Sequence, residues 1–148
     1  LYPVGRLDLK SRGAMLLTNH GELTLQLTHP RYSHTKTYLV WVRGQPSDQL
    51  LEQWRTGVIL DSKPTMKAKV NLLQSQPDRS LIKVVLKEGK NRQIRRTAEL
   101  LGHPVIDLQR IEIAGLTIKG LPEGHWRKLR INEWSQLLSL PASKSTDL

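Results

Sequence analysis

Short runs in which apolar and polar residues alternate recur along the chain, and they constrain its fold more than any other feature. The clearest is Lys36–Arg43, where Tyr38, Val40 and Val42 share one face of an extended segment. This pattern predicts a half-buried β-strand. Further strands are predicted at Ala14–Thr18, Thr65–Leu73, Leu81–Lys87, Val105–Ile113 and Trp126–Ile131. A chain with so many strand segments is expected to fold around a sheet.

Helices interrupt these strands without a regular strand–helix–strand rhythm. Pro46–Arg55 and Gln93–Leu101 carry apolar residues at helical spacing, and a glycine follows each segment as a stop signal. A short last helix is expected from Asn132 onward, through residue 138. Residues 23–27 alternate like a strand but also fit one helical turn, and we predict a helix because a turn precedes them and Pro30 ends the segment. The mixture predicts an α+β fold with a mixed or largely antiparallel sheet flanked by helices.

The chain is strongly basic. Among its 148 residues, 23 lysines and arginines outnumber 13 acids, which gives a formal net charge of +10. This excess favours a polyanionic partner, with nucleic acid first and an anionic membrane surface second. The basic residues concentrate in residues 1–47 and in Lys83–Arg96. A solvated face explains either run alone, but we expect the fold to bring the two runs together.

Several classes of function find no support in the sequence. No apolar run approaches the roughly 20 residues of a spanning helix. The absence of cysteine excludes disulfide scaffolds, zinc ribbons and cysteine nucleophiles, and it fits a reducing compartment. The histidines show no metal-ligand spacing, and no Walker-type loop, GxGxxG or GxSxG motif occurs. We therefore expect no metal site.

The first group of residues that could carry chemistry is residues 4–8, which set one carboxylate in a basic neighbourhood. Gly5 allows a tight turn, and Leu7 is expected to anchor the segment while Arg6 and Asp8 project to the other side. The plainer alternative is that Asp8 caps a turn or pairs with Lys10 or Arg12. From these residues alone, we favour the plainer alternative.

Two further groups could bind a nucleic acid. Tyr38, close to Lys36 at the start of a strand, is either a stacking platform for a base or a half-buried strand tyrosine. In residues 88–96, Arg92 and Arg95 lie about one turn apart on a predicted helix. Their face could hold phosphates, pair with a distant carboxylate, or be solvated.

Seven motifs follow one another along the chain: GRLD, TN-x-GEL, LTHPRY, KTY, EGKNRQIRR, LGHPV and GLPEGHWRKL. In this combination the sequence resembles the catalytic domain of the RsuA/RluB/RluE/RluF family of ribosomal RNA pseudouridine synthases, from about Tyr2 to about Glu133. The resemblance implies the pseudouridine synthase fold with a central RNA-binding cleft. The sequence departs from the usual family pattern at Ser11, His20 and Thr97.

The resemblance also implies roles for individual residues. Asp8 matches the catalytic aspartate, Tyr38 the tyrosine that stacks on the target base, and Arg95 the cation that pairs with the aspartate. Ile94 would form an apolar wall of the pocket. The residues expected to hold the RNA backbone are Arg6, Lys36, Arg92 and Arg96. The implied reaction requires neither a metal nor a cofactor, because uridine and pseudouridine are isomers.

The implied function is the conversion of a specific uridine in ribosomal RNA to pseudouridine, with Asp8 acting as a nucleophile at the sugar or as a base near C2′. Within this family, arginine rather than lysine at position 95 favours large-subunit ribosomal RNA as the substrate. Two alternatives stay open. One is a non-catalytic RNA-binding or ribosome-assembly domain on the same fold, and the other is a DNA-binding protein that uses the helix at Gln93–Leu101.

We expect residues 1–139 to form one catalytic domain and residues 140–148 to be a disordered tail. Family members usually carry a helical RNA-binding module and an opening strand before GRLD, so we expect the sequence to be part of a longer enzyme. The expected partner is structured ribosomal RNA with the uridine flipped out. We expect a monomer in the bacterial cytoplasm or an organelle, neither secreted nor bound to a membrane.

Overall fold

The computed structural model describes residues 1–28, 34–90 and 92–139. Its elements, in chain order, are β1 (Tyr2–Val4), β2 (Arg12–Gly13), β3 (Leu16–Thr18), α1 (Gly21–Thr28), β4 (Lys36–Arg43), α2 (Asp48–Thr56), β5 (Ile59–Leu60), β6 (Lys63–Pro64), β7 (Lys69–Ser75), β8 (Arg79–Leu86), α3 (Gln93–Leu100), β9 (Val105–Ile113), β10 (Leu116–Thr117) and α4 (Ile131–Ser139).

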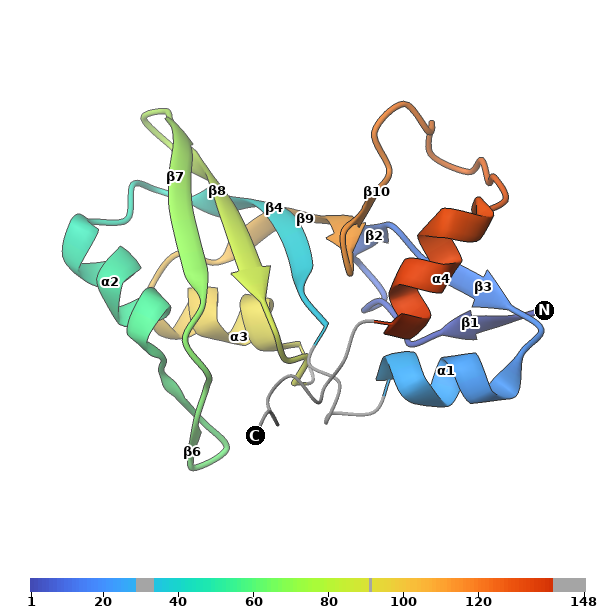
Figure 1. Cartoon of the computed structure of the whole chain (residues 1–148). Helices are drawn as coiled ribbons and strands as arrows, with labels where there is room; N and C mark the ends of the chain where they lie inside the picture. Colours follow the sequence, from blue (N-terminus) through green and yellow to red (C-terminus); the bar gives the residue numbers. More distant parts are fainter. Residues whose placement is uncertain (29–33, 91, 140–148) are drawn as a thin grey trace.

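The main sheet has the strand order β10-β9-β4-β8-β7, and the short β2 pairs with β9 off this path (Figure 1). Strands β4 and β8 pair over their whole length, from Lys36 opposite Leu86 to Arg43 opposite Arg79. All pairings in this sheet are antiparallel except that of β2 with β9, which is parallel. The expected α+β fold with a mixed, largely antiparallel sheet is confirmed.

The core lies on one face of this sheet. Alternate residues of β4 and β8 are buried there, among them Val40, Val42, Ile82 and Val84, as their period-2 patterns predict. Helices α2 and α3 contribute Leu51, Trp54, Ile94 and Ala98 to the same hydrophobic cluster. Full burial of one such valine or isoleucine stabilises the fold by about 1.5–3 kcal/mol.

A smaller group of elements lies beyond β9 and β10. Strands β1 and β3 pair antiparallel, and α1 contacts both strands and α4. Figure 1 shows this group across the molecule from α2 and β7. The chain between β1 and β2, which carries Asp8, therefore lies where the two parts of the molecule meet.

The helix boundaries follow from local signals in the sequence. The hydroxyl oxygen of Ser47 accepts a hydrogen bond from the Leu50 N–H at 3.2 Å at the start of α2, and Gly57 ends this helix with a positive φ of 112°. Helix α3 and strand β9 match their predicted segments. Helix α1 confirms the helical prediction for residues 23–27, while Pro30 lies outside the described residues.

Two predicted strands require correction. Residues 126–130 form an exposed loop rather than a strand, and α4 begins at Ile131. Glu133 instead fixes the start of this helix, because its carboxylate accepts a hydrogen bond from the Arg130 N–H at 2.7 Å. Strand β7 begins only at Lys69, because the Thr65 and Ala68 N–H groups bond back to Val58 and Arg55. The predicted tail, residues 140–148, lies outside the described residues.

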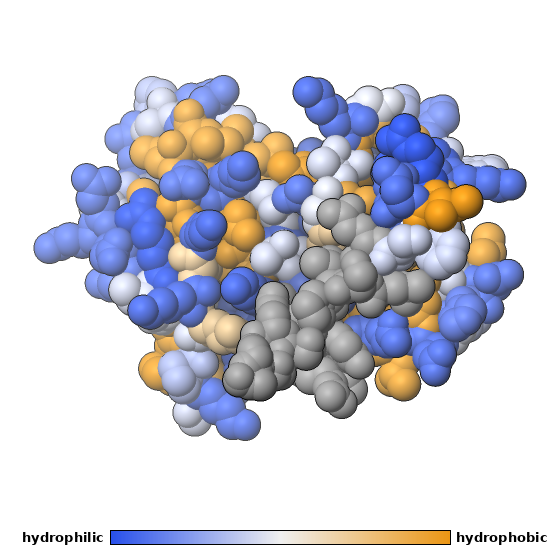
Figure 2. Space-filling view, in the orientation of Figure 1, coloured by the Kyte–Doolittle hydropathy of each residue, from blue (hydrophilic) through white to orange (hydrophobic). Residues whose placement is uncertain are grey.

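Hydrophilic side chains cover much of the face seen in Figure 2, and hydrophobic residues gather over the β7–β8 hairpin. Leu72 and Leu73 of β7 are exposed there. No helix in the described ranges is both long and apolar enough to cross a membrane.

Candidate active site

A cavity of about 550 Å³ opens between the main sheet and the segment that carries Asp8. Its volume lies within the range of about 300–1,000 Å³ that is typical of small-ligand sites. The residues of its wall that matter here are Arg6, Leu7, Asp8, Ser11, His34, Lys36, Tyr38, Lys90, Arg92, Gln93, Ile94 and Arg110. The fold thus brings together residues that lie as far apart in the sequence as Val4 and Ile113.

The charges of this cavity wall are almost all positive. Among the described residues that line it, Asp8 is the only carboxylate, and the lysines and arginines are Arg6, Lys36, Lys90, Arg92 and Arg110. Burial and the charge of Arg110 lower the pKa of Lys36, and burial and the charge of Lys36 lower the pKa of His34. Cations that repel one another in this way attract an anionic ligand.

Asp8 lies in a turn that follows β1. The Ser11 N–H donates to the Asp8 carbonyl oxygen at 3.0 Å, which leaves the half-buried Asp8 side chain in the cavity wall. Leu7 is also half-buried and lines the same cavity, so the expected division between an anchoring Leu7 and an opposed Asp8 is wrong. The carboxylate of Asp8 forms no ion pair with Lys10 or Arg12, so the plainer alternative of a local pair is wrong as well.

The expected ion pair between Asp8 and Arg95 is not formed in this structure. Arg95, in the first turn of α3, donates from Nη2 to the Ser11 hydroxyl at 3.2 Å. Its Nε is buried and has no hydrogen-bond partner in the described part of the chain. Arg95 turns towards Ser11 and towards the charge of Asp107 on β9, a residue whose pKa it helps to lower. Arg95 therefore lies beside the turn that carries Asp8, and its hydrogen bond to Ser11 joins it to the end of that turn.

Arg12 clamps the end of that turn onto β9. Its Nε and Nη2 donate to the two carboxylate oxygens of Asp107 at 3.1 and 2.7 Å. The hydrogen bonds from Arg12 are the main cause of the lowered pKa of Asp107. A bidentate pair of this kind fixes direction as well as distance, and it holds the Asp8 segment against the sheet.

Tyr38 lies at the junction of the core and the cavity. It is only 8% exposed, belongs to the hydrophobic cluster and lines the cavity. Burial raises the pKa of Tyr38, a hydrogen bond and the positive charge from Arg110 oppose this rise, and the charge of Asp8 adds to it. Tyr38 therefore lies within electrostatic reach of both Asp8 and Arg110.

Arg110 is a site residue to which the sequence analysis assigned no role. It is 5% exposed, and its Nε and Nη2 donate to the Ala14 carbonyl oxygen at 3.0 and 2.7 Å. The Ala14 N–H in turn donates to the Arg110 carbonyl oxygen at 2.7 Å. The sequence does carry a signal for this role, because Arg110 stands two residues after Leu108 and so on the inward face of a predicted strand. A charged residue on that face requires a buried partner.

The second basic run enters the site only in part. Arg92 and Lys90 line the cavity, whereas Arg96 lies outside the cavity wall and donates to Asp61 at 2.8 Å. Ile94 is buried and contributes apolar surface to the wall, as expected.

Gln93, another residue missed from the sequence, shapes the entry into α3. Its side chain donates to Glu88 at 2.9 Å and accepts from the Lys90 N–H at 3.1 Å. These contacts fix the loop that carries the cavity-lining cations Lys90 and Arg92.

The chain is similar to known proteins in both sequence and fold. Residues 1–100 match the model of a family described as RNA pseudouridylate synthase. The chain is 42% identical over 142 residues to ribosomal large subunit pseudouridine synthase B of Bacillus subtilis (strain 168), covering 95% of this chain and 58% of that protein. It is 35% identical over 145 residues to ribosomal large subunit pseudouridine synthase E of Vibrio vulnificus (strain CMCP6), covering 88% and 62%.

A solved crystal structure of a pseudouridylate synthase superposes with a TM-score of 0.85 at 29% identity, covering 91% of this chain and 58% of that one. The human RNA pseudouridylate synthase domain containing 1 shares the fold, with a TM-score of 0.60 at 15% identity. The chain belongs to the RNA pseudouridylate synthase family. It spans less than two thirds of the length of the curated relatives given above.

Proposed function

We propose that this protein converts a specific uridine of ribosomal RNA to pseudouridine and that large-subunit RNA is its substrate. The observation that carries the proposal is that Asp8, Tyr38 and Ile94 share one cavity whose remaining charges are cationic. The names of the bacterial relatives support ribosomal RNA of the large subunit. Such a substrate places the reaction in the bacterial cytoplasm or in an organelle that contains ribosomes.

The reaction is an internal rearrangement. The N1–C1′ bond of uridine breaks, the uracil rotates, and C5 forms a bond to C1′; the C5 proton leaves and N1 regains a proton. Atoms and electrons balance within the nucleotide, so the step demands no oxidant and no second substrate. What the site must supply is one reactive group, a surface for the detached base and a hold on the backbone.

Asp8 is the reactive group in this proposal, because it is the only carboxylate among the described residues of the cavity wall. It attacks C1′ as a nucleophile or takes a proton near C2′ as a base, and both routes require an ionised, well-oriented oxygen. The turn closed by the Ser11 N–H presents that oxygen to the cavity.

Arg95 orients Asp8 when RNA is bound. A buried donor without a partner costs about 1–3 kcal/mol, and the Arg95 Nε is such a donor. Its Nη2 already contacts Ser11, three residues from Asp8, and catalytic hydrogen bonds often tighten only in the substrate complex. We infer that the carboxylate of Asp8 pairs with Arg95 in that complex.

Tyr38 receives the uracil. A uridine leaves its base stack to enter a pocket of this kind, at a cost of a few kcal/mol, and stacking on an aromatic ring returns about 1–3 kcal/mol. Ile94 closes the pocket with apolar surface. Arg6, Lys36 and Arg92 contact phosphates at the cavity, and Arg96 contacts the strand farther out.

The test is the release of tritium from C5-labelled uridine in ribosomal RNA by the full-length protein. Asp8→Asn keeps the size of the side chain and removes its charge, and it should lower the rate by roughly 10,000-fold or more. The matched control is Asp78→Asn, at an exposed aspartate beside Arg79 on the β7–β8 hairpin, which should leave the rate unchanged.

If neither the unmodified protein nor Asp8→Asn forms pseudouridine in ribosomal RNA, the enzymatic proposal is overturned. Equal and measurable rates for the two proteins would overturn the role of Asp8 instead. RNA binding without any pseudouridine, by either protein, would support the non-catalytic RNA-binding alternative. A preference for duplex DNA over structured RNA in competition would support the DNA-binding alternative.

A further inference from the structure

The loop between β10 and α4, residues 118–130, has a defined shape although it contains no strand or helix. The Leu121 N–H donates to the Ile118 carbonyl oxygen at 2.9 Å, and the His125 N–H donates to that of Pro122 at 3.1 Å. At the start of the loop, the Lys119 N–H donates to the Thr117 hydroxyl at 3.0 Å. These turns hold the backbone of a segment whose side chains are mostly exposed.

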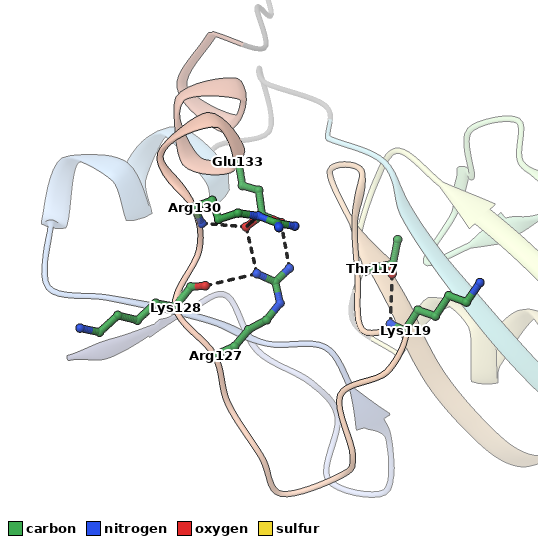
Figure 3. A network of polar contacts seen from close by, with 6 residues as sticks. All are labelled: Thr117, Lys119, Arg127, Lys128, Arg130 and Glu133. Atoms are coloured by element: carbon green, nitrogen blue, oxygen red, sulfur yellow. Dashed lines mark hydrogen bonds and ion pairs between the residues drawn. The ribbon is translucent and has the colours of Figure 1, made fainter.

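Glu133, in the first turn of α4, anchors the far end of this loop (Figure 3). Arg127 donates two hydrogen bonds to the Glu133 carboxylate at 2.9 and 2.8 Å, and the Arg130 N–H donates a third at 2.7 Å. The hydrogen bonds from Arg127, followed by that from the Arg130 backbone, lower the pKa of Glu133 to about 2. The Glu133 carboxylate is therefore ionised at neutral pH.

The hydrogen bonds between Arg127 and Glu133 hold the neighbouring backbone at the protein surface. Trp126, next to Arg127, is 75% exposed, although a tryptophan is among the costliest side chains to leave in water. In Figure 3, the side chain of Lys128 extends from one side of the Arg127–Glu133 network, and that of Lys119 extends from the opposite side. A single exposed apolar residue is ordinary on a protein surface, but an exposed aromatic ring followed directly in sequence by Arg127 and Lys128 matches the way single-stranded nucleic acid is bound.

The loop is also tied to the cavity wall. Glu123, in its middle, accepts from Arg12 Nη1 at 3.4 Å, and Arg12 follows the cavity-lining Ser11 directly. The same arginine forms the bidentate pair with Asp107 described above. The loop therefore lies beside the segment that lines the cavity.

We propose that residues 118–130 form a second RNA-binding surface, on which Trp126 stacks on an unpaired base next to the target nucleotide while Lys119 and Lys128 contact phosphates. The proposal rests on RNA being the substrate, as proposed above, and it adds a contact outside the cavity. The loop serves to hold single-stranded RNA that flanks the flipped uridine.

The test uses the full-length protein with two probes, a 12-nucleotide oligouridylate and a 12-base-pair RNA duplex. Binding is measured by anisotropy of labelled RNA and by quenching of tryptophan fluorescence. Trp126→Ala should weaken binding of the oligouridylate by roughly 5- to 100-fold, the value of one stacked base, and weaken binding of the duplex much less. Trp126→Phe should keep most of the affinity but lose most of the quenching.

The control is Trp134→Phe on α4, at a tryptophan that is 41% exposed, which should keep both the affinity and the quenching. Unchanged oligouridylate binding by Trp126→Ala, or undiminished quenching in Trp126→Phe, would overturn the proposal. An equal loss for both probes would also overturn it, because phosphate contacts alone would then explain the effect. Neither measurement needs turnover, so the result stands apart from the test of Asp8.

Discussion

A single buried guanidinium joins the parts of the candidate site. Arg110 holds the Ala14 carbonyl oxygen with two hydrogen bonds, and its charge and hydrogen bond reach Tyr38. Ala14 follows the segment that carries Asp8, so one side chain sets the spacing between the proposed reactive carboxylate and the proposed stacking ring. A buried cation is tolerated in a protein only when it is paired in this way.

Replacement of Arg110 by methionine should therefore change both the stability and the titration of Tyr38. Loss of hydrogen bonds from a charged group to the buried Ala14 carbonyl should lower the free energy of unfolding by about 1.5–3 kcal/mol. The pKa of Tyr38 should rise further, because burial and Asp8 already raise it and Arg110 is the influence that opposes them. Denaturant unfolding and phenolate absorbance, with Tyr38→Phe identifying the relevant tyrosine, measure the two effects.

The control is Arg79→Met, at a half-buried arginine at the start of β8 whose partner Asp78 is exposed, which should change stability by no more than about 0.5 kcal/mol. An unchanged tyrosine titration in Arg110→Met would show that Arg110 does not act on Tyr38.

At the scale of elements, the two-residue strand β2 holds the segment that carries Asp8 against the main sheet. It pairs in parallel with β9, with Arg12 opposite Gln109 and Gly13 opposite Arg110. Gly13 has a φ of +126°, and a Cβ atom at this position would overlap the Arg110 backbone carbonyl. Only glycine allows the Asp8 segment to approach β9 this closely.

Gly13→Ala should accordingly detach this segment from the sheet. The clash with backbone, added to the positive φ, should cost roughly 3 kcal/mol, whereas Gly102→Ala, with a φ of +88° and nothing within 4 Å, should cost only about 1 kcal/mol. Hydrogen exchange checks this, because the Ala14 N–H, bonded to the Arg110 carbonyl oxygen, should lose its protection only in Gly13→Ala. Retained protection there would contradict the account of β2.

Elements with a sustained period were predictable from the sequence, and those held by distant partners were not. Lys36–Arg43 and Val105–Ile113 carry enough alternation to define their strands, and both match the structure. Strand β2 has too few residues for any period, and its position depends on β9, far along the chain. The segment 126–131 has no sustained period, since its apolar residues stand at 126, 129 and 131, and the bonds of Glu133 decide its conformation.

For the molecule as a whole, the distribution of charge matters more than its total of +10. The sequence correctly indicated that the two basic runs meet, since Arg6 and Lys36 share the cavity wall with Arg92. It could not indicate that Arg96 is directed to Asp61 or that Arg95 contacts Ser11, because such pairings depend on side-chain directions that the fold alone determines.

The salt dependence of RNA binding should follow the same distribution. If Arg92 contacts one phosphate, Arg92→Ala should make the slope of log K against log salt shallower by roughly 1, with a similar loss of affinity for all RNA sequences. The control is Arg43→Ala, at the other end of β4 from Lys36, which should leave the slope unchanged. Titrations of a structured ribosomal RNA fragment from low to high salt measure the slope for the unmodified protein and for both variants. Equal slopes for all three proteins would show that Arg92 does not contact a phosphate.

The reciprocal bonds between Ala14 and Arg110 join positions 96 residues apart in the sequence. During synthesis, the segment that carries Asp8 leaves the ribosome early but has no place to dock until β9 has also emerged. The cavity is therefore completed only after β9 has emerged, and a nascent chain that already exposes the segment with Asp8 does not yet contain the site proposed above.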